Sequence, residues 1–135
     1  MTTKITDFLL ELGKGFSFVG RQIKLLVSDT EYFIDMLFYH LDLRCFIVIE
    51  LKAGKFKPEY AGKLNFYLSA VDEQLRRAGD NPSIGIILCK KKDSIEVEYS
   101  LRDINKPIGV SDYILSQAVP LDLAGKLPTV EELEE

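Results

Sequence analysis

An apolar run that ends in charged residues constrains the fold of this chain more than any other feature. Residues 45–49 are all apolar, and Glu50 and Lys52 follow almost directly. A strand that is apolar on both faces is typical of the centre of a sheet covered on both sides. A second apolar run, residues 84–89, comes after a helical stretch, and a strand, helix, strand order favours parallel pairing through a right-handed crossover. The two runs therefore predict a layered α/β domain.

The other elements follow from residue spacing and from turn residues. Apolar residues three and four positions apart predict a long amphipathic helix over 60–75, and Pro58 is typical of a helix start. Similar patterns predict a short helix over 5–12, strands over 16–27 and 32–39 that pair as a hairpin, a short helix over 95–101 and a final strand over 108–113. The expected core is αβββαβ, a mixed sheet flanked by helices. We expect residues 1–126 to form one domain and residues 127–135 to form an acidic, disordered tail.

Composition excludes several classes of protein. The chain has 135 residues and is 47% hydrophobic, so it can bury a core without disulfides. Its apolar runs are far shorter than the roughly 20 residues of a membrane-spanning helix, and no signal-peptide pattern is present, so we expect a cytoplasmic protein without a membrane partner. Cys45 and Cys89 lie in apolar runs and are predicted to be buried. The single histidine, His40, excludes paired-histidine chemistry, and we expect it to be a structural residue at a strand end.

The net charge of −4 hides a strong asymmetry along the chain. Residues 1–43 carry a net charge of −2, residues 44–92 carry +5, and residues 93–135 carry −7. A basic middle followed by an acidic end means that the overall charge says little about what the middle binds. The acidic total therefore does not exclude a nucleic-acid partner.

Charged residues interrupt the apolar strands at a few specific positions. Asp35 lies inside the apolar strand predicted over 32–39. Residues two apart in a strand point the same way and lie about 6.6 Å apart, so Glu50 and Lys52 share one face. If the two strands are neighbours, Asp35 can lie beside Glu50, and two close carboxylates favour a divalent cation such as Mg²⁺ or Mn²⁺ over zinc. For each residue alone, capping a turn or pairing with a lysine is the alternative.

An Asp in one strand, followed by Glu-x-Lys at the end of the next, resembles the signature of the PD-(D/E)XK nuclease superfamily. Longer stretches of the chain are similar to the C-terminal nuclease domain of YhcG-like bacterial proteins over roughly residues 5–120. The stretches that carry this resemblance are 8–22, 32–40, 49–52, 55–62, 65–68 and 84–89. The resemblance implies a restriction-endonuclease-like core and Mg²⁺-dependent hydrolysis of phosphodiester bonds. It also implies an upstream helical, DNA-binding domain, so we expect this chain to be the C-terminal half of a larger protein.

The resemblance assigns roles to individual residues. Asp35 and Glu50 would be the metal ligands, with the backbone carbonyl of Leu51 as a third. Lys52 would orient or help to deprotonate the attacking water and offset charge in the transition state. Glu11 is a weaker candidate, because some superfamily members place a glutamate of the first helix at the metal site. Gln22 is a further weak candidate for the same cleft.

Lysines that follow the predicted catalytic strand are candidates for contact with phosphates. They are Lys55, Lys57 and Lys63, and the alternative is a solvated charged face. Tyr67 is similar in position to the tyrosine of a Gln-x-x-x-Tyr element in RecB-type nucleases, and Lys63 stands where that glutamine would be. Both residues are therefore candidates for contact with nucleic acid.

Three functions remain open at this stage. The first is a metal-dependent nuclease that acts on DNA, and a homodimer would suit an enzyme that cuts both strands. The second is a catalytically inactive nucleic-acid-binding or assembly module with the same fold. The third, less favoured by the sequence, is a hydrolase of RNA or of another phosphoester.

Overall fold

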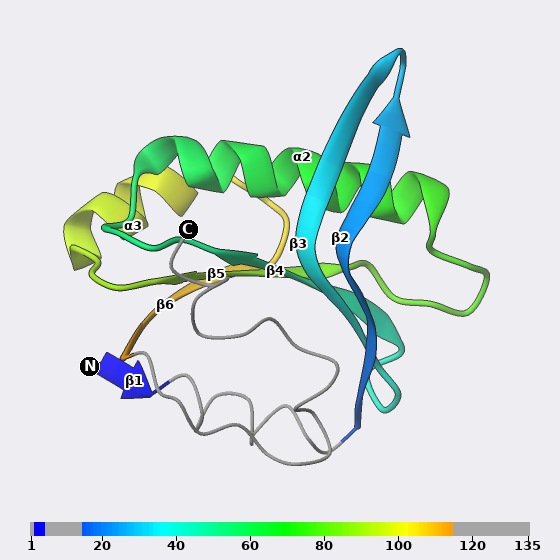
Figure 1. The fold of residues 1–135 in the computed structure, drawn as a ribbon, viewed down its shortest axis with the longest axis horizontal. Coiled ribbons are helices and arrows are strands. Elements are labelled where there is room, and N and C mark those ends of the chain that lie inside the picture. The colour runs from blue at the N-terminus through cyan, green and yellow to red at the C-terminus, as the bar shows by residue number, and fades with distance from the viewer. Residues whose placement is uncertain (1, 5–14, 115–135) are drawn as a thin grey trace.

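Strands and helices make up most of the chain in a computed structural model that describes residues 2–4 and 15–114 (Figure 1). The strands are β1 (Thr2–Lys4), β2 (Phe16–Val27), β3 (Thr30–His40), β4 (Cys45–Leu51), β5 (Ile84–Cys89) and β6 (Ile108–Ile114), and the helices are α2 (Pro58–Gln74) and α3 (Ser94–Leu101). The predicted strands, the long helix and the short helix over 95–101 are confirmed to within a few residues. The helix expected over 5–12 and the tail over 127–135 lie outside the described residues.

The strands form one mixed sheet in the order β1-β6-β5-β4-β3-β2. β2, β3 and β4 pair antiparallel, whereas β4, β5, β6 and β1 pair parallel. The parallel pair β4 and β5 is joined through α2, as the strand, helix, strand pattern predicts. β1 was not expected, because three polar or charged residues carry no periodic signal of a strand.

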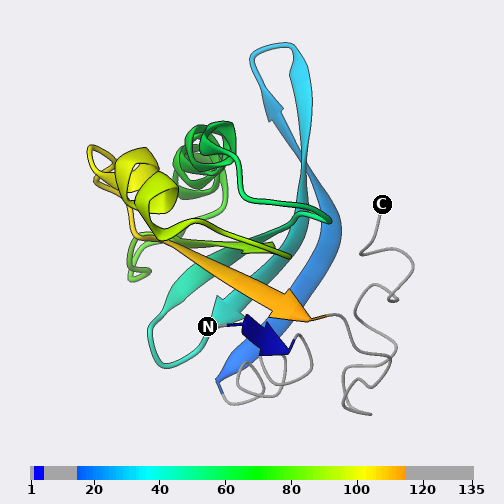
Figure 2. The same ribbon diagram turned by 90° about the vertical axis from the view of Figure 1, so that its left-hand side faces the viewer.

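Both described helices lie on one face of the sheet (Figures 1 and 2). Buried residues of α2, including Leu64, Leu68 and Val71, pack there against Val48 and Ile87 of the sheet. α2 approaches β5 very closely at Gly85, where an added Cβ would come within 2.7 Å of Leu64 Cδ2. A glycine at this position therefore lets the helix lie close to the strand that follows it.

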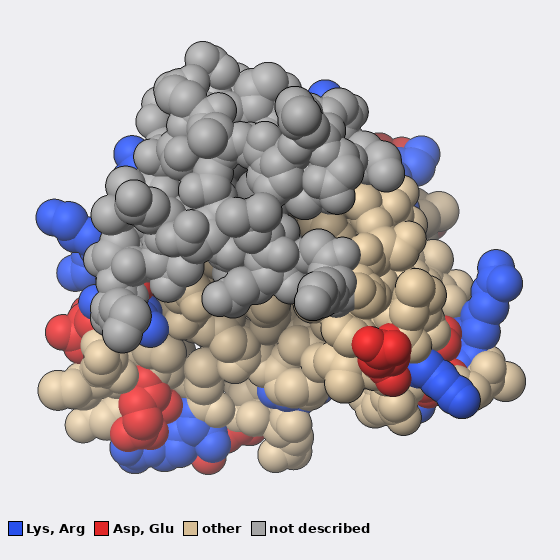
Figure 3. All heavy atoms as spheres, turned by 90° about the horizontal axis from the view of Figure 1, so that it is seen from below, with Lys and Arg blue, Asp and Glu red and all other residues tan. Residues whose placement is uncertain are grey.

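The opposite face of the sheet is also apolar. Ile47 and Ile49 of β4 are buried there with Met36, Phe38 and Leu88, whereas Val48 faces α2. Seen from that side, most charged side chains lie at the margins, and the described part between them is mostly uncharged (Figure 3). β4 is therefore a central strand that is apolar on both faces, as predicted. None of the described helices is long and apolar enough to cross a membrane.

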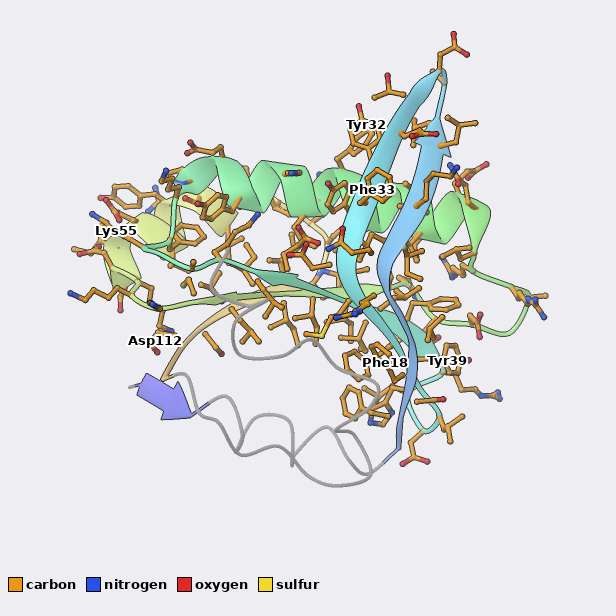
Figure 4. All side chains as sticks on the ribbon, in the orientation of Figure 1. Phe18, Tyr32, Phe33, Tyr39, Lys55 and Asp112 are labelled. Carbon is orange, nitrogen blue, oxygen red and sulfur yellow. The ribbon has the colours of Figure 1, made fainter. Side chains whose placement is uncertain are left out.

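The β2–β3 hairpin extends well beyond the sheet and past α2 (Figure 1). Its two-residue connection follows the pair Val27 and Thr30. On the side that faces α2, Tyr32 packs on Phe66 with ring centroids 4.8 Å apart (Figure 4). The hairpin is thus fixed against the helix, and Asp35 lies near its base.

Candidate active site

β3 and β4 stop pairing through their main chains at Asp35 and Glu50. The last regular pair of the ladder is Met36 with Ile49. One residue further on, the Asp35 N–H donates to Glu50 Oε2 at 3.0 Å, and the Leu51 N–H donates to Asp35 Oδ2 at 2.8 Å. Each carboxylate thus accepts from the main chain of the opposite strand. The structure brings Asp35 beside Glu50, as the sequence predicts.

Glu50 carries its carboxylate into the interior. The residue is only 4% exposed. Burial and the negative charge of Asp35 raise its pKa from 4.5 to about 7, although the Asp35 N–H and the ammonium groups of Lys52 and Lys63 partly offset the rise. The charges of the described residues therefore do not fully compensate an ionised Glu50.

Lys52 lies on the same side of β4 as Glu50. Its Nζ is 3.9 Å from Glu50 Oε1 and 4.7 Å from the centre of the Tyr60 ring. The Tyr60 ring therefore supports the ammonium group on the side of α2. The sequence marked Tyr60 only as a helical core position, and no motif distinguished it from other apolar residues of the helix.

The main chain of Leu51 is oriented toward Asp35. The Leu51 N–H donates to the Asp35 carboxylate, whereas the next residue, Lys52, donates its N–H to Leu88 O of β5 at 2.8 Å. The N–H and C=O of one strand residue point to the same side. The Leu51 carbonyl is therefore on the side of Asp35, where the family resemblance implies a backbone ligand.

Gln22 is brought to the same carboxylate from β2. Its Nε2 lies 3.4 Å from Asp35 Oδ1, a long contact, and its φ is 50°, an uncommon value for a residue other than glycine inside a strand. Gln22 falls between the pairs Arg21–Met36 and Ile23–Ile34, after a register shift between Phe18 and Gly20. This irregular stretch of β2 directs the amide to Asp35.

The other candidate residues lie at different distances from the carboxylates. Lys63 stands 5.6 Å from the centre of the Tyr67 ring, and its charge acts on Glu50. Tyr67 is 2% exposed and packs against Tyr32, so its ring is part of the core beside the site rather than of the surface. Lys55 and Lys57 are exposed in the segment between β4 and α2. Glu11 lies outside the described residues.

The residues that the sequence analysis treated as structural are confirmed as such. The Leu43 N–H donates to His40 Nδ1 at 3.0 Å, so His40 caps the turn between β3 and β4. Cys45 and Cys89 are buried free thiols.

The site offers oxygen donors and the ammonium group of Lys52 rather than a complete set of metal ligands. Among residues 2–4 and 15–114, no group of three or more His, Cys, Asp or Glu side chains is gathered in a way that could hold a metal ion. Asp35, Glu50 and the Leu51 carbonyl are hard oxygen donors, which suit Mg²⁺ or Mn²⁺. The buried, incompletely compensated carboxylate is the feature that fits a divalent cation.

Comparisons with known proteins identify relatives of this chain. The model of the family described as the YhcG PDDEXK nuclease domain matches residues 1–128. A protein of Escherichia coli strain K12, described as "Putative nuclease YhcG", is 40% identical over 109 residues, which are 81% of this chain and 29% of that protein. The chain thus spans less than a third of the length of this relative.

Two solved structures share the fold at 14% sequence identity. The crystal structure of a repair endonuclease from Pyrococcus abyssi matches with a TM-score of 0.58 over 81% of this chain and 45% of that chain. A structure described as an EndoMS-dsDNA2 complex matches with a TM-score of 0.54 over 83% and 45%. These matches confirm the expected PD-(D/E)XK-like fold. With the family match, they lead to one conclusion: the chain belongs to the YhcG PDDEXK nuclease domain family.

Proposed function

We propose that this chain is the nuclease domain of a larger protein, and that it hydrolyses phosphodiester bonds of DNA with Mg²⁺ or Mn²⁺. Membership of a nuclease family supports the reaction class. The similarity to a structure described as a complex with dsDNA supports DNA as the substrate. The length of the E. coli relative supports a larger protein, which would supply further contacts to DNA.

One observation carries the proposal. The Asp35 N–H holds Glu50 and the Leu51 N–H holds Asp35. Glu50 is buried and Asp35 is half-buried, and the Lys52 ammonium lies 3.9 Å from Glu50. A fold that needed only a strand end there could use neutral residues, because a buried carboxylate beside a second carboxylate is costly without a partner. We infer that the pair is kept for a cation and for chemistry.

Asp35, Glu50 and the Leu51 carbonyl would hold the cation. When bound, it would polarise a phosphoryl oxygen and lower the pKa of a coordinated water. The residues of the chain fix the ligands: the Leu51 N–H orients the Asp35 carboxylate, and the Asp35 N–H orients Glu50. Such support for a ligand limits its rotation and keeps both carboxylates aimed at one place.

Lys52 would act on the attacking water and on the phosphate. Its ammonium, held between Glu50 and the Tyr60 ring, is a positive charge close to both carboxylates. It would hydrogen-bond the water that attacks phosphorus and offset the negative charge that develops on the phosphoryl oxygens.

A cleavage assay tests the proposal. The purified chain is incubated with DNA and Mg²⁺ or Mn²⁺ beside Asp35→Ala and Lys52→Ala, with Glu31→Ala as the matched control. Glu31 is an exposed carboxylate of the hairpin, and its Oε2 lies 3.5 Å from Lys24 Nζ. We expect both site variants to lose at least about 100-fold in rate and the control to retain its activity.

Folding of each variant is checked by circular dichroism and thermal unfolding. Equal cleavage by wild type, Asp35→Ala and Lys52→Ala would remove these residues from the chemistry. A folded wild type that neither binds Mn²⁺ nor cleaves DNA would instead favour the inactive nucleic-acid-binding module. Cleavage of RNA in preference to DNA in a competition assay would change the substrate class.

A further inference from the structure

The segment that follows β4 is attached to the segment that follows β5. The Lys90 N–H donates to Gly54 O at 2.9 Å, and the Phe56 N–H donates to Lys91 O at 2.8 Å. Lys55 and Lys91 face each other in a parallel bridge. Phe56 is buried and packs against Tyr60. These contacts extend the pairing of the two strands beyond the regular sheet and fix the main chain of both segments.

This attachment gathers lysines that are about 35 positions apart in the sequence. Lys55, Lys57, Lys90 and Lys91 are all exposed, and we call them the lysine platform. None of the four forms an ion pair with a carboxylate in the described part of the chain. Lys92 is different, because its Nζ donates to Val110 O at 3.1 Å and thus has a structural contact.

The platform is a cost to the fold rather than a support for it. Like charges that face each other across paired strands are destabilising, and Lys55 and Lys91 are such a pair. The main-chain bonds and the burial of Phe56 would hold this segment with neutral residues in place of the lysines. An anionic partner is the simplest compensation for ammonium groups on such a fixed surface.

The platform begins next to the candidate active site. Lys55 is three residues beyond Lys52, so their Cα atoms are at most about 11 Å apart. Figure 4 places Lys55 at the end of the sheet where α2 begins, far from Tyr39 at the opposite end. One strand of duplex DNA rises about 3.4 Å along the helix axis for each phosphate, so a strand that leaves the site on this side would place at most about three phosphates over this distance.

We propose that the lysine platform binds the sugar–phosphate backbone of the nucleic acid on one side of the scissile phosphate. This inference rests on the proposed function, since it deepens the account of the same site. It adds Lys90 and Lys91 to the lysines that the sequence singled out. Contacts of this kind fix the position of the substrate and carry no sequence preference.

Binding is measured separately from cleavage to test the platform. A short fluorescein-labelled DNA duplex is titrated in EDTA over a range of salt concentrations with wild type and with the double variant Lys90→Gln, Lys91→Gln. The matched control is Arg76→Gln, Arg77→Gln. It removes the same charge at the other end of the 17-residue helix α2, about 25 Å away, where Arg76 and Arg77 contact Asp80.

We expect the platform variant to lower the slope of log K against log salt by about 1.8, since each phosphate contact contributes about 0.9. The control variant should change this slope by much less. In the cleavage assay, the platform variant should have a higher KM than the wild type and a kcat close to that of the wild type. Thermal unfolding confirms that both variants fold.

The outcomes separate this inference from the proposed function. Equal slope changes in the two variants, or none in the platform variant, would overturn the platform, even if the chain cleaves DNA. If the platform variant lowers the salt slope but the wild-type chain does not cleave DNA, the result would support the platform and refute the proposed nuclease function. A large fall in kcat without a change in slope would also overturn the platform, because it would place Lys90 and Lys91 in the chemistry instead.

Discussion

Asp35 and Glu50 replace the regular main-chain pairing of β3 and β4 with two hydrogen bonds that each use one carboxylate. The Asp35 N–H donates to Glu50 Oε2, and Asp35 Oδ2 accepts from the residue after Glu50. The carboxylates are thus fixed by the backbone of the opposite strand and not by other side chains alone.

The pH dependence of stability should report Glu50 in the metal-free chain. Its pKa is raised from 4.5 to about 7 in the fold, so between these values the folded chain keeps a proton that the unfolded chain has released. Stability should therefore fall as pH rises from about 5 to 7, by at most about 1.4 kcal/mol per pH unit from this group.

Urea unfolding in EDTA from pH 5 to pH 8 measures this effect, with Glu50→Gln as the reference. The variant keeps an acceptor for the Asp35 N–H but cannot ionise. We expect the free energy of unfolding of Glu50→Gln to increase relative to that of the wild type as pH rises. A stability difference that is independent of pH would mean that Glu50 is ionised throughout this interval.

Binding of a metal ion should restore the stability that the wild type loses as pH rises. A ligand that binds only the folded chain stabilises it by about 2.7 kcal/mol at a hundred times its Kd. Mn²⁺ should raise the melting temperature of the wild type at pH 8, and Asp35→Asn should abolish the rise. Ca²⁺, a larger hard cation, serves as a comparison. An equal rise in Asp35→Asn would place the ion elsewhere.

Gln22 should act as a positioning residue for Asp35. Its φ of 50° suits glycine, so Gln22→Gly removes the amide while it relieves the backbone. We expect this variant to be at least as stable as the wild type and to lose about 10- to 100-fold in activity or in apparent Mn²⁺ affinity. Gln22→Ala should lose both stability and activity. If Gln22→Gly has wild-type kinetics, the Gln22 side chain does not position Asp35.

The close approach of α2 to β5 should be sensitive to one methyl group. Gly85→Ala would place a carbon within 2.7 Å of Leu64, so we expect a loss of about 1 to 3 kcal/mol in the free energy of unfolding. At Gly109, in the neighbouring strand β6, no described residue other than its chain neighbours has an atom within 4 Å of the Cβ that an alanine would add. Gly109→Ala is therefore the matched control and should be close to neutral in a denaturant titration.

Much of the fold and part of the site could be predicted from the sequence because they depend on local patterns. The apolar run before Glu50 defines a central strand, and the alternation of strand residues places Lys52 beside Glu50. The pairing of the flanking strands then puts Asp35 in reach. Asp35, Glu50 and Lys52 also form the superfamily signature that the sequence resembles.

Other features depend on register and on distant contacts, which single residues do not reveal. Gln22 reaches Asp35 because the ladder shifts register between Phe18 and Gly20, and no local pattern marks such a shift. Lys91 meets Lys55 only because β4 and β5 are neighbours. The support of Lys52 by Tyr60 likewise depends on how α2 lies on the sheet.

A crystal structure of the chain soaked with Mn²⁺ tests the central claim most directly, since the anomalous signal of Mn²⁺ locates the ion without assumptions about the reaction. We predict one strong peak between Asp35 and Glu50, with carboxylate oxygens of both residues and the Leu51 carbonyl about 2.1 Å from the ion. A fully occupied Mn²⁺ site elsewhere, or no peak at this pair under conditions where the chain cleaves DNA, would contradict the account.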